Sequence, residues 1–172
     1  MVRRAGPCYA SLMAALILPL AEAAAHLPTR GALIGLDLGS KTIGVAASDP
    51  DRRLASAVET IARGNFSADA ARLLALAAER QAVAFVLGLP LNMDGSEGPR
   101  CQSVRQFAAN IEKHGPPALA ALPIVLQDER LSTAAVTRGM IEDYDMSRAR
   151  RAERIDAAAA AWILESALAR LK

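Results

Sequence analysis

Residues 35–49 read Gly-Leu-Asp-Leu-Gly-Ser-Lys-Thr-Ile-Gly-Val-Ala-Ala-Ser-Asp, and they are the most informative stretch of the chain. A short apolar run over 32–36 leads into the carboxylate of Asp37. A turn follows at Gly39-Ser40-Lys41, and a second apolar run contains Gly44. The pattern predicts a strand, an acid, a tight turn and a second strand. Because glycines let another chain approach closely, the acid is well placed to meet a metal ion or a phosphate, although the polar end of a plain hairpin has the same pattern.

Length and composition are typical of one domain with a real core. The chain has 172 residues, of which 52% are hydrophobic and only 3% aromatic. The net charge of +2 permits an anionic partner without requiring one. Two cysteines, Cys8 and Cys101, and two histidines, His26 and His114, form no zinc-binding motif. A reduced cytosolic protein is therefore expected.

The first residues partly resemble a secretory signal peptide. Arg3-Arg4 precede an apolar run over 9–20, and small residues follow over 21–25. Against export, Pro19 interrupts that run and Glu22 lies where cleavage would fall. The run is also too short to cross a bilayer. This segment alone supports export and retention about equally.

We expect residues 1–30 to be an N-terminal extension of a single domain over residues 31–172. A helix over 13–25 is predicted to cap that domain. Translation from Met13 rather than Met1 is an alternative for the start of the chain.

After residue 30, apolar runs of strand length alternate with amphipathic segments of helix length. The predicted strands lie over 33–37, 42–48, 54–59, 84–87 and 124–127. The predicted helices lie over 67–80, 101–113, a segment that reaches residue 141, and 149–171. Pro50-Asp51 mark the turn between the second and third strands, so the first three strands form a meander.

This order predicts an α/β fold with a mixed five-stranded sheet flanked by helices. Crossover helices make the first, fourth and fifth strands parallel. Their carboxyl ends share one edge, where ligands bind in open α/β sheets. Three unusual segments reach that edge: Asp37, Gly88-Leu89-Pro90 and Asp128-Glu129-Arg130. The edge therefore combines two or three carboxylates with a glycine-rich loop.

Asp156 adds one more acid from the last predicted helix. It stands at the head of an apolar stripe and is followed by five alanines, which fit a helix pressed close to the sheet. A carboxylate at the margin of a core needs a partner. That partner is either an arginine, Arg130 or Arg154, or a metal ion shared with Asp37 and Glu129, and spacing does not choose between them.

Three carboxylates without a histidine or thiolate set favour a hard cation, Mg²⁺ or Mn²⁺. Such a cluster can hold two ions about 4 Å apart for phosphodiester cleavage. Nearby cations could bind the phosphate backbone: Lys41, Arg130, Arg148, Arg150, Arg151 and Arg154.

Four motifs in this order resemble the YqgF family of bacterial proteins. They are Asp-Leu-Gly-Ser-Lys-Thr-Ile-Gly-Val-Ala (37–46), Gly-Leu-Pro-Leu-Asn-Met-Asp-Gly-Ser (88–96), Asp-Glu-Arg-Leu-Ser-Thr (128–133) and Ile-Asp-Ala-Ala-Ala-Ala (155–160). The resemblance covers about residues 32–171 and implies an RNase H-like fold related to Holliday junction resolvases. It also implies an endonuclease that matures the 5′ end of pre-16S ribosomal RNA.

The resemblance assigns the catalytic and metal-binding roles to Asp37, Glu129 and Asp156. Whether Asp128 joins them stays open, because strand alternation should point it the other way. Substrate binding is expected from Lys41, Gly88, Pro90, Asn92, Gly95, Arg130, Ser132 and Thr133. Ser132 or Thr133 could instead cap a helix, and Asn92 could instead shape a turn.

Three other functions fit parts of the same pattern. A DNA junction resolvase would use the same carboxylates as a symmetric dimer, and the sequence leaves monomer or homodimer open. An actin-like ATPase or sugar kinase would need a second similar domain, for which 172 residues leave no room. A non-catalytic ribosome-assembly factor would gain nothing from clustered negative charge near RNA. A ribosomal RNA substrate implies a cytoplasmic protein without a membrane partner, which decides against export.

Overall fold

The computed structural model describes residues 16–130 and 148–171, with the backbone alone for 148–152. These residues form one six-stranded sheet in the order β1-β6-β5-β2-β3-β4. The strands are β1 (Ile17–Pro19), β2 (Ala32–Leu38), β3 (Thr42–Ser48), β4 (Ala55–Ala62), β5 (Ala82–Leu89) and β6 (Ile124–Asp128). The helices are α1 (Leu20–Ala23), α2 (Phe66–Arg80), α3 (Pro99–His114), α4 (Pro117–Ala120) and α6 (Arg148–Arg170).

β2, β3 and β4 form the meander that the sequence predicts. β3 pairs antiparallel with both neighbours, and Gly44 of β3 lies opposite Asp37 of β2. The β2–β3 turn is closed by a hydrogen bond of 2.9 Å from the Gly39 N–H to the Thr42 carbonyl. This tight connection fixes the register, and so fixes which residue stands beside Asp37.

β2, β5 and β6 are parallel, as crossover helices between them require. Leu36 pairs with Leu87, and Leu87 pairs with Leu126, so the carboxyl ends of the three strands meet at one edge. An antiparallel meander followed by two parallel crossovers is the RNase H-like arrangement. The predicted fold class is therefore confirmed.

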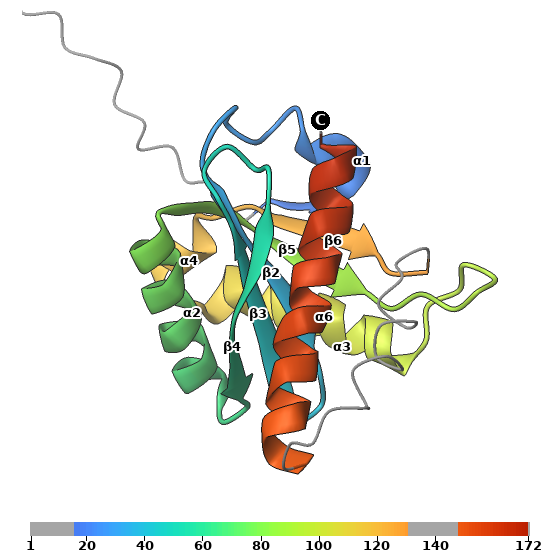
Figure 1. The fold of residues 1–172 in the computed structure, drawn as a ribbon. Helices are drawn as coiled ribbons and strands as arrows, with labels where there is room; N and C mark the ends of the chain where they lie inside the picture. The colour runs from blue at the N-terminus through green and yellow to red at the C-terminus, as the bar shows by residue number, and fades with distance from the viewer. Residues whose placement is uncertain (1–15, 131–147, 172) are drawn as a thin grey trace, which may run out of the picture.

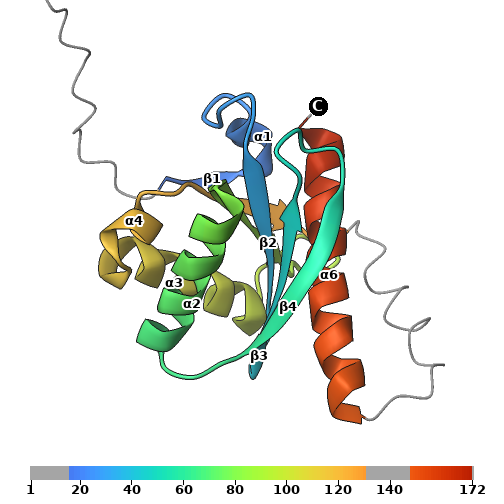
Figure 2. The ribbon, with the colours of Figure 1, turned by 60° about the vertical axis from the view of Figure 1, so that its left-hand side comes forward.

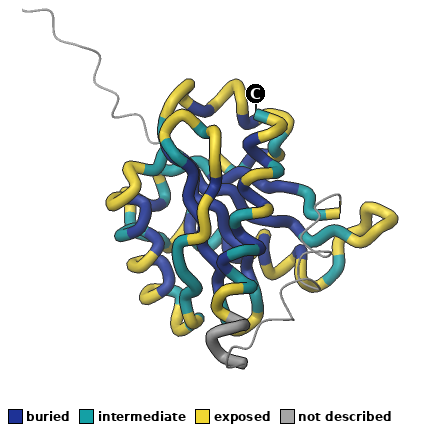
Figure 3. The backbone as a smooth tube through the Cα atoms, viewed as in Figure 1, coloured by how far each residue is buried: buried dark blue, intermediate teal, exposed yellow. Residues whose placement is uncertain are grey.

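Helices cover both faces of the sheet (Figure 1, Figure 2). α2, α3 and α4 pack on one face, over Leu36, Phe85 and their neighbours. α6 packs on the other face, over Leu33, Val86 and Val125. The strands β2, β3, β5 and β6 are therefore mostly buried, whereas the edge strand β4, the turns and the outer helix surfaces carry exposed residues (Figure 3). Burial on both faces explains the continuous apolar runs in the sequence.

α6 lies very close to the sheet because small residues line the contact. Ala160 and Ala167 are 0% exposed. A Cβ added to Gly35 of β2 would lie 2.8 Å from Leu164 Cβ, and a Cβ added to Gly44 of β3 would overlap the backbone of Asp156. The alanine run and these strand glycines together allow the close approach that the sequence predicts.

The predicted helix over 13–25 is wrong for the residues that are described. Residues 17–19 instead form β1, which pairs in parallel with β6, and α1 is a single turn. The sheet therefore has six strands rather than five. Without β1, β6 would present an open edge, and covering it also buries Leu18, Ala23 and Leu27.

Other boundaries differ from the predictions by a few residues. The third predicted strand continues to Ala62, and the helix predicted from residue 101 begins at Pro99, which suits a first helical turn. The predicted helix that reaches residue 141 lies outside the described residues. Within residues 16–130 and 148–171, no helix has the length and apolar character that crossing a membrane requires.

Candidate active site

Asp37 is a buried carboxylate near the carboxyl end of β2. It is 7% exposed and stands in register with Gly44 of β3. Side chains alternate along a strand, and Leu33 and Gly35 of β2 both face α6. The side chain of Asp37 therefore faces α6 as well.

Glu129 follows β6 and reaches the same face. Gln127, two residues earlier, donates a hydrogen bond of 3.0 Å from Nε2 to Ser166 Oγ of α6. The Glu129 backbone N–H donates to the Leu89 carbonyl at 3.1 Å. A Cβ added to Gly88 would overlap Glu129 Oε1, so the Glu129 carboxylate lies directly over this glycine. Any larger residue at position 88 would displace the Glu129 carboxylate.

Asp156 comes from α6, on the helix side of the same edge. Its backbone carbonyl lies against Gly44, the register partner of Asp37. Its side-chain Oδ2 accepts a hydrogen bond of 2.6 Å from Thr42 Oγ1 at the start of β3. The α6 backbone at Asp156 therefore packs directly on the β3 residue that stands beside Asp37.

The three predicted carboxylates share one face and one edge of the sheet. β2 and β5 are paired up to the residues just before Asp37 and Gly88, so the glycine under Glu129 adjoins Asp37. Among the residues that the structure describes, no three acidic, histidine or cysteine side chains come close enough to enclose one ion. The set still fits a hard divalent cation in donor chemistry and in its placement on one face.

Asp128 leaves this face and pairs with Arg130. Asp128 is in register with Leu89, which packs in the opposite core. Arg130 Nη2 lies 2.8 Å from Asp128 Oδ2, and the Arg130 backbone N–H donates to Oδ1 at 2.9 Å. The guanidinium holds the pKa of Asp128 below its usual value. Arg130, one arginine considered for Asp156, thus has an acid of its own.

The loop after β5 is held by its own polar side chains. Asn92 Nδ2 donates to Ser96 Oγ at 2.9 Å, and the Ser96 hydroxyl donates to Asp94 Oδ1 at 2.6 Å. Hydrogen bonds from Ser96 lower the pKa of Asp94. Gly95 adopts a φ of +87°, which favours glycine, and a Cβ there would lie 3.1 Å from Arg130 Nη1. Asn92 therefore helps to shape this turn, and its role in substrate binding stays a prediction.

The other residues predicted to bind substrate lie around this edge or outside the described residues. Lys41 is exposed in the β2–β3 turn, and Pro90 is half-buried directly after β5. Ser132 and Thr133 lie outside the described residues, so their roles stay predictions. The arginine side chains within 148–152 also lie outside the described part of the chain.

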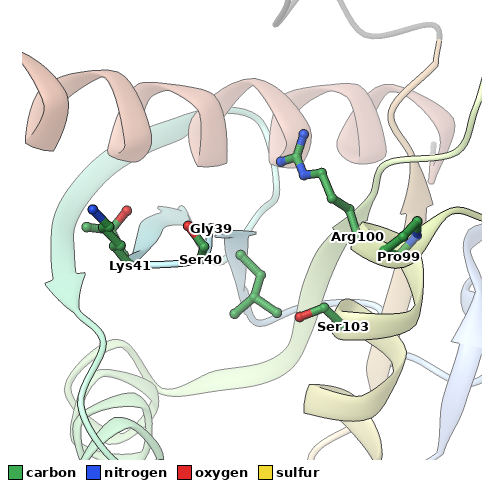
Figure 4. Close-up of a pocket in the computed structure, with 8 residues that line it drawn as sticks. Gly39, Ser40, Lys41, Pro99, Arg100 and Ser103 are labelled. Carbon is green, nitrogen blue, oxygen red and sulfur yellow. The ribbon is translucent and has the colours of Figure 1, made fainter.

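Two residues not predicted from the sequence belong to this region. Thr42 donates a hydrogen bond to the Asp156 carboxylate. The only feature of the sequence that could have indicated this role is the position of Thr42 directly after the Gly39-Ser40-Lys41 turn. Arg100 lies in the first turn of α3, opposite the same turn across a groove of about 510 Å³ (Figure 4). In the sequence, Arg100 could have been placed near a helix start because it follows Pro99, and proline is typical of the first helical turn.

The family model described as "RuvX: Holliday junction resolvase" matches residues 31–170. The chain belongs to the RuvX family. This membership confirms the resemblance found in the four sequence motifs, which all lie within the matched residues.

RuvX relatives are similar over nearly their whole length. A protein of Rhodopseudomonas palustris (strain TIE-1) is 69% identical over 159 residues, which are 92% of this chain and 96% of that protein. A protein of Nitrobacter winogradskyi is 65% identical over 92% of this chain and 94% of that protein. Both carry the name "Putative pre-16S rRNA nuclease". Among solved structures, Thermus thermophilus RuvC in complex with a Holliday junction substrate gives a TM-score of 0.48 at 13% identity, over 81% of this chain and 95% of that chain.

Proposed function

We propose that this chain is a metal-dependent endonuclease that cuts at the 5′ end of pre-16S ribosomal RNA during ribosome biogenesis. The observation that carries the proposal is the gathering of Asp37, Glu129 and Asp156 on one face and one edge of the sheet. The name shared by the two RuvX relatives supports this RNA as the substrate.

Phosphodiester hydrolysis needs an activated water and a stabilised leaving oxygen. Asp37, Glu129 and Asp156 would hold one or two Mg²⁺ or Mn²⁺ ions, which supply both functions when bound. β2 fixes the position of Asp37, and the Thr42 hydroxyl orients Asp156. The chain thus places negative charge in advance where a cation and the reacting phosphate would meet.

Cations at the same edge would hold phosphates that flank the cut. Lys41 is exposed and takes part in none of the ion pairs of the described residues. Arg130 also lies at this edge, beside Gly95, but its charge is shared with Asp128. Lys41 is therefore expected to contribute more to phosphate binding than Arg130.

A second candidate function is the resolution of branched DNA, which the description of the RuvX family favours. It would use the same three carboxylates and would need two copies of the chain acting on a symmetric junction. We favour RNA because both of the RuvX relatives described above carry the RNA name. In that role the protein would act in the cytoplasm, on bare RNA or on RNA within a ribosomal particle.

Cleavage of two substrates separates these functions. The full chain would be offered a 5′-extended small-subunit rRNA fragment and a synthetic four-way DNA junction, each with Mg²⁺ or Mn²⁺ and with EDTA. We expect metal-dependent cutting of the RNA at a defined position and none of the junction. Symmetric cutting of the junction alone would assign the resolvase function instead. The nuclease function would be rejected if the protein cut neither the junction nor the RNA, with the RNA offered both bare and within a precursor ribosomal particle.

Replacing Thr42 with valine is expected to lower kcat about 10- to 100-fold, because a partner that orients a metal-binding carboxylate typically contributes this much. Valine keeps the shape of threonine and removes the hydroxyl that donates to Asp156 Oδ2. Turnover of the RNA would be measured across a range of Mg²⁺ concentrations, and the Mg²⁺ concentration that gives half-maximal turnover should rise.

Thr60→Val is the matched control for this change. Thr60 Oγ1 also donates to α6, but its acceptor is the backbone carbonyl of Glu153 rather than a carboxylate. Thr42→Ser should restore activity because it restores the donor. If kcat fell equally in Thr42→Val and Thr60→Val, the Thr42 hydroxyl would matter only because it attaches α6 to the sheet, and not because it orients Asp156.

A further inference from the structure

We propose that the groove between the β2–β3 turn and the first turns of α3 binds a backbone phosphate of the RNA strand, next to the phosphate that is cut. The proposal rests on the nuclease function proposed above. The groove has a volume of about 510 Å³ and opens to solvent. Its lining residues are Leu38, Gly39, Ser40, Lys41, Thr42, Pro99, Arg100 and Ser103.

The lining of the groove is positively charged and rich in hydroxyl donors. Figure 4 shows Ser40 and Lys41 on one side, and Arg100 and Ser103 on the other. None of the lining residues is acidic. The side chains of Lys41 and Arg100 are exposed and enter none of the ion pairs in the described part of the chain.

Other arginines of the described residues contrast with this pair. Arg105, on the same helix as Arg100, donates to the Glu97 carboxylate from both Nε and Nη2. Arg72 and Arg130 are likewise held by acidic side chains. Two cations that face one groove without such partners suit an anion with several oxygens, and a phosphate accepts from ammonium, guanidinium and hydroxyl groups alike.

The walls of the groove are fixed before any ligand arrives. Arg63 Nη1 donates to the Gly39 carbonyl at 2.8 Å, and the Arg63 backbone N–H donates to the Lys41 carbonyl at 2.9 Å. The same guanidinium lies over the Phe107 ring of α3, 5.7 Å from its centroid. Arg63 therefore ties the backbone of the β2–β3 turn, which carries Lys41, to α3, which carries Arg100.

The groove adjoins the candidate active site through two residues. Leu38 lines it and directly follows Asp37 in β2. Thr42 lines it and donates its hydroxyl to Asp156. The groove lies on the α3 side of this end of the sheet, and the carboxylates lie on the α6 side. An RNA strand that crosses this end of the sheet would place its scissile phosphate at the carboxylates and a neighbouring phosphate in the groove. Phosphate contacts of this kind position a strand without reading its sequence.

The test is RNA binding by a chain with Lys41→Gln and Arg100→Gln combined. Affinity for a short RNA that spans the cut would be measured by fluorescence anisotropy at several salt concentrations, in an Asp37→Asn background that prevents cutting. We expect at least a tenfold loss of affinity at low salt. The slope of log affinity against log salt should become shallower by about 0.7 for each phosphate that the variant no longer neutralises.

Lys113→Gln is the matched control for charge. Lys113 is exposed in the last turn of the same helix and also enters no ion pair among the described residues. The Lys113→Gln variant should bind RNA with the affinity of the Asp37→Asn background protein and with the same slope of log affinity against log salt. Because Lys41 and Arg100 are exposed, the double variant should keep the wild-type melting temperature. Charge-keeping changes, Lys41→Arg with Arg100→Lys, should restore most of the affinity.

Single methylphosphonate substitutions in the RNA locate the bound phosphate. In the background protein, neutralising one phosphate beside the cut should weaken binding, and in the double variant the same substitution should have no further effect. Equal affinities of the double variant and Lys113→Gln, or full sensitivity to methylphosphonates in the double variant, would overturn the proposal. Binding is read without cutting, so a groove that binds RNA in a chain that never cuts it would support the groove and reject the nuclease.

Discussion

Replacing Asp37 with asparagine is expected to lower cleavage of the pre-rRNA fragment about 1000-fold and to leave the fold intact. Asparagine keeps the shape of the side chain but removes its charge, and metal-ion catalysis supplies several kcal/mol of transition-state stabilisation. Asp37 is 7% exposed on a strand buried along its length, so no other group can easily take its place. Single-turnover rates with Mg²⁺ and the melting temperature would be measured together.

Asp128→Asn is the matched control, since Asp128 lies directly before Glu129 and differs in its surroundings. Its carboxylate pairs with Arg130 and belongs to the opposite face of the sheet. We expect activity within a few-fold of wild type. Full activity in Asp37→Asn would refute the assignment of the metal site. A large loss in Asp128→Asn would add that carboxylate to the set.

Alanine at Gly44 is expected to destabilise the fold by about 3 kcal/mol or more. The added Cβ would meet backbone atoms of α6, which cannot rotate away as a side chain can. The added Cβ would overlap the Asp156 carbonyl and would lie 3.1 Å from the Ala157 nitrogen. α6 would have to move away from β3. The melting temperature should fall by about 6–12 °C, and activity should fall with it because Asp156 moves.

Alanine at Gly88 is expected to separate stability from activity. The nearest atoms to its Cβ would belong to side chains, Glu129 Oε1 and, at 2.6 Å, Ile163 Cδ1, which yield more easily than a backbone. We expect a loss of stability of about 1 kcal/mol and a loss of kcat of about 100-fold, since Glu129 is displaced. Gly64→Ala is the control, because nothing lies within 4 Å of a Cβ there. If Gly88→Ala kept wild-type kcat, the position of Glu129 over Gly88 would not matter for cleavage.

Local sequence patterns predicted the order of strands and helices and the mixed sheet, and the resemblance of the four motifs implied that this arrangement is RNase H-like. Apolar periodicity and turn residues are local signals, and the parallel crossovers then follow from general rules of chain connection. The same reasoning placed Asp37 at a strand end and the alanines of α6 against the sheet, where the structure has them. It also brought the three candidate carboxylates to one edge.

Short segments without a strong period were harder to predict. Residues 17–19 are apolar and lie within a longer apolar run, which fits a helix equally well by pattern. They become β1 because β6 offers an open edge beside them. A segment of three residues contains too few side chains for its own sequence to decide its conformation.

The contacts between polar groups follow from the three-dimensional packing of the elements and not from any local pattern. The hydrogen bond from Thr42 to Asp156 joins residues 114 positions apart, and neither residue signals the other in the sequence. Arg130, which the sequence offers as a partner for Asp156 or for phosphate, forms an ion pair with Asp128. Lys41 and Arg100 line one groove, and Arg63 ties the turn that carries Lys41 to α3. Such contacts depend on how close the packed elements come and on which side chains they turn inward, and a local pattern carries neither quantity.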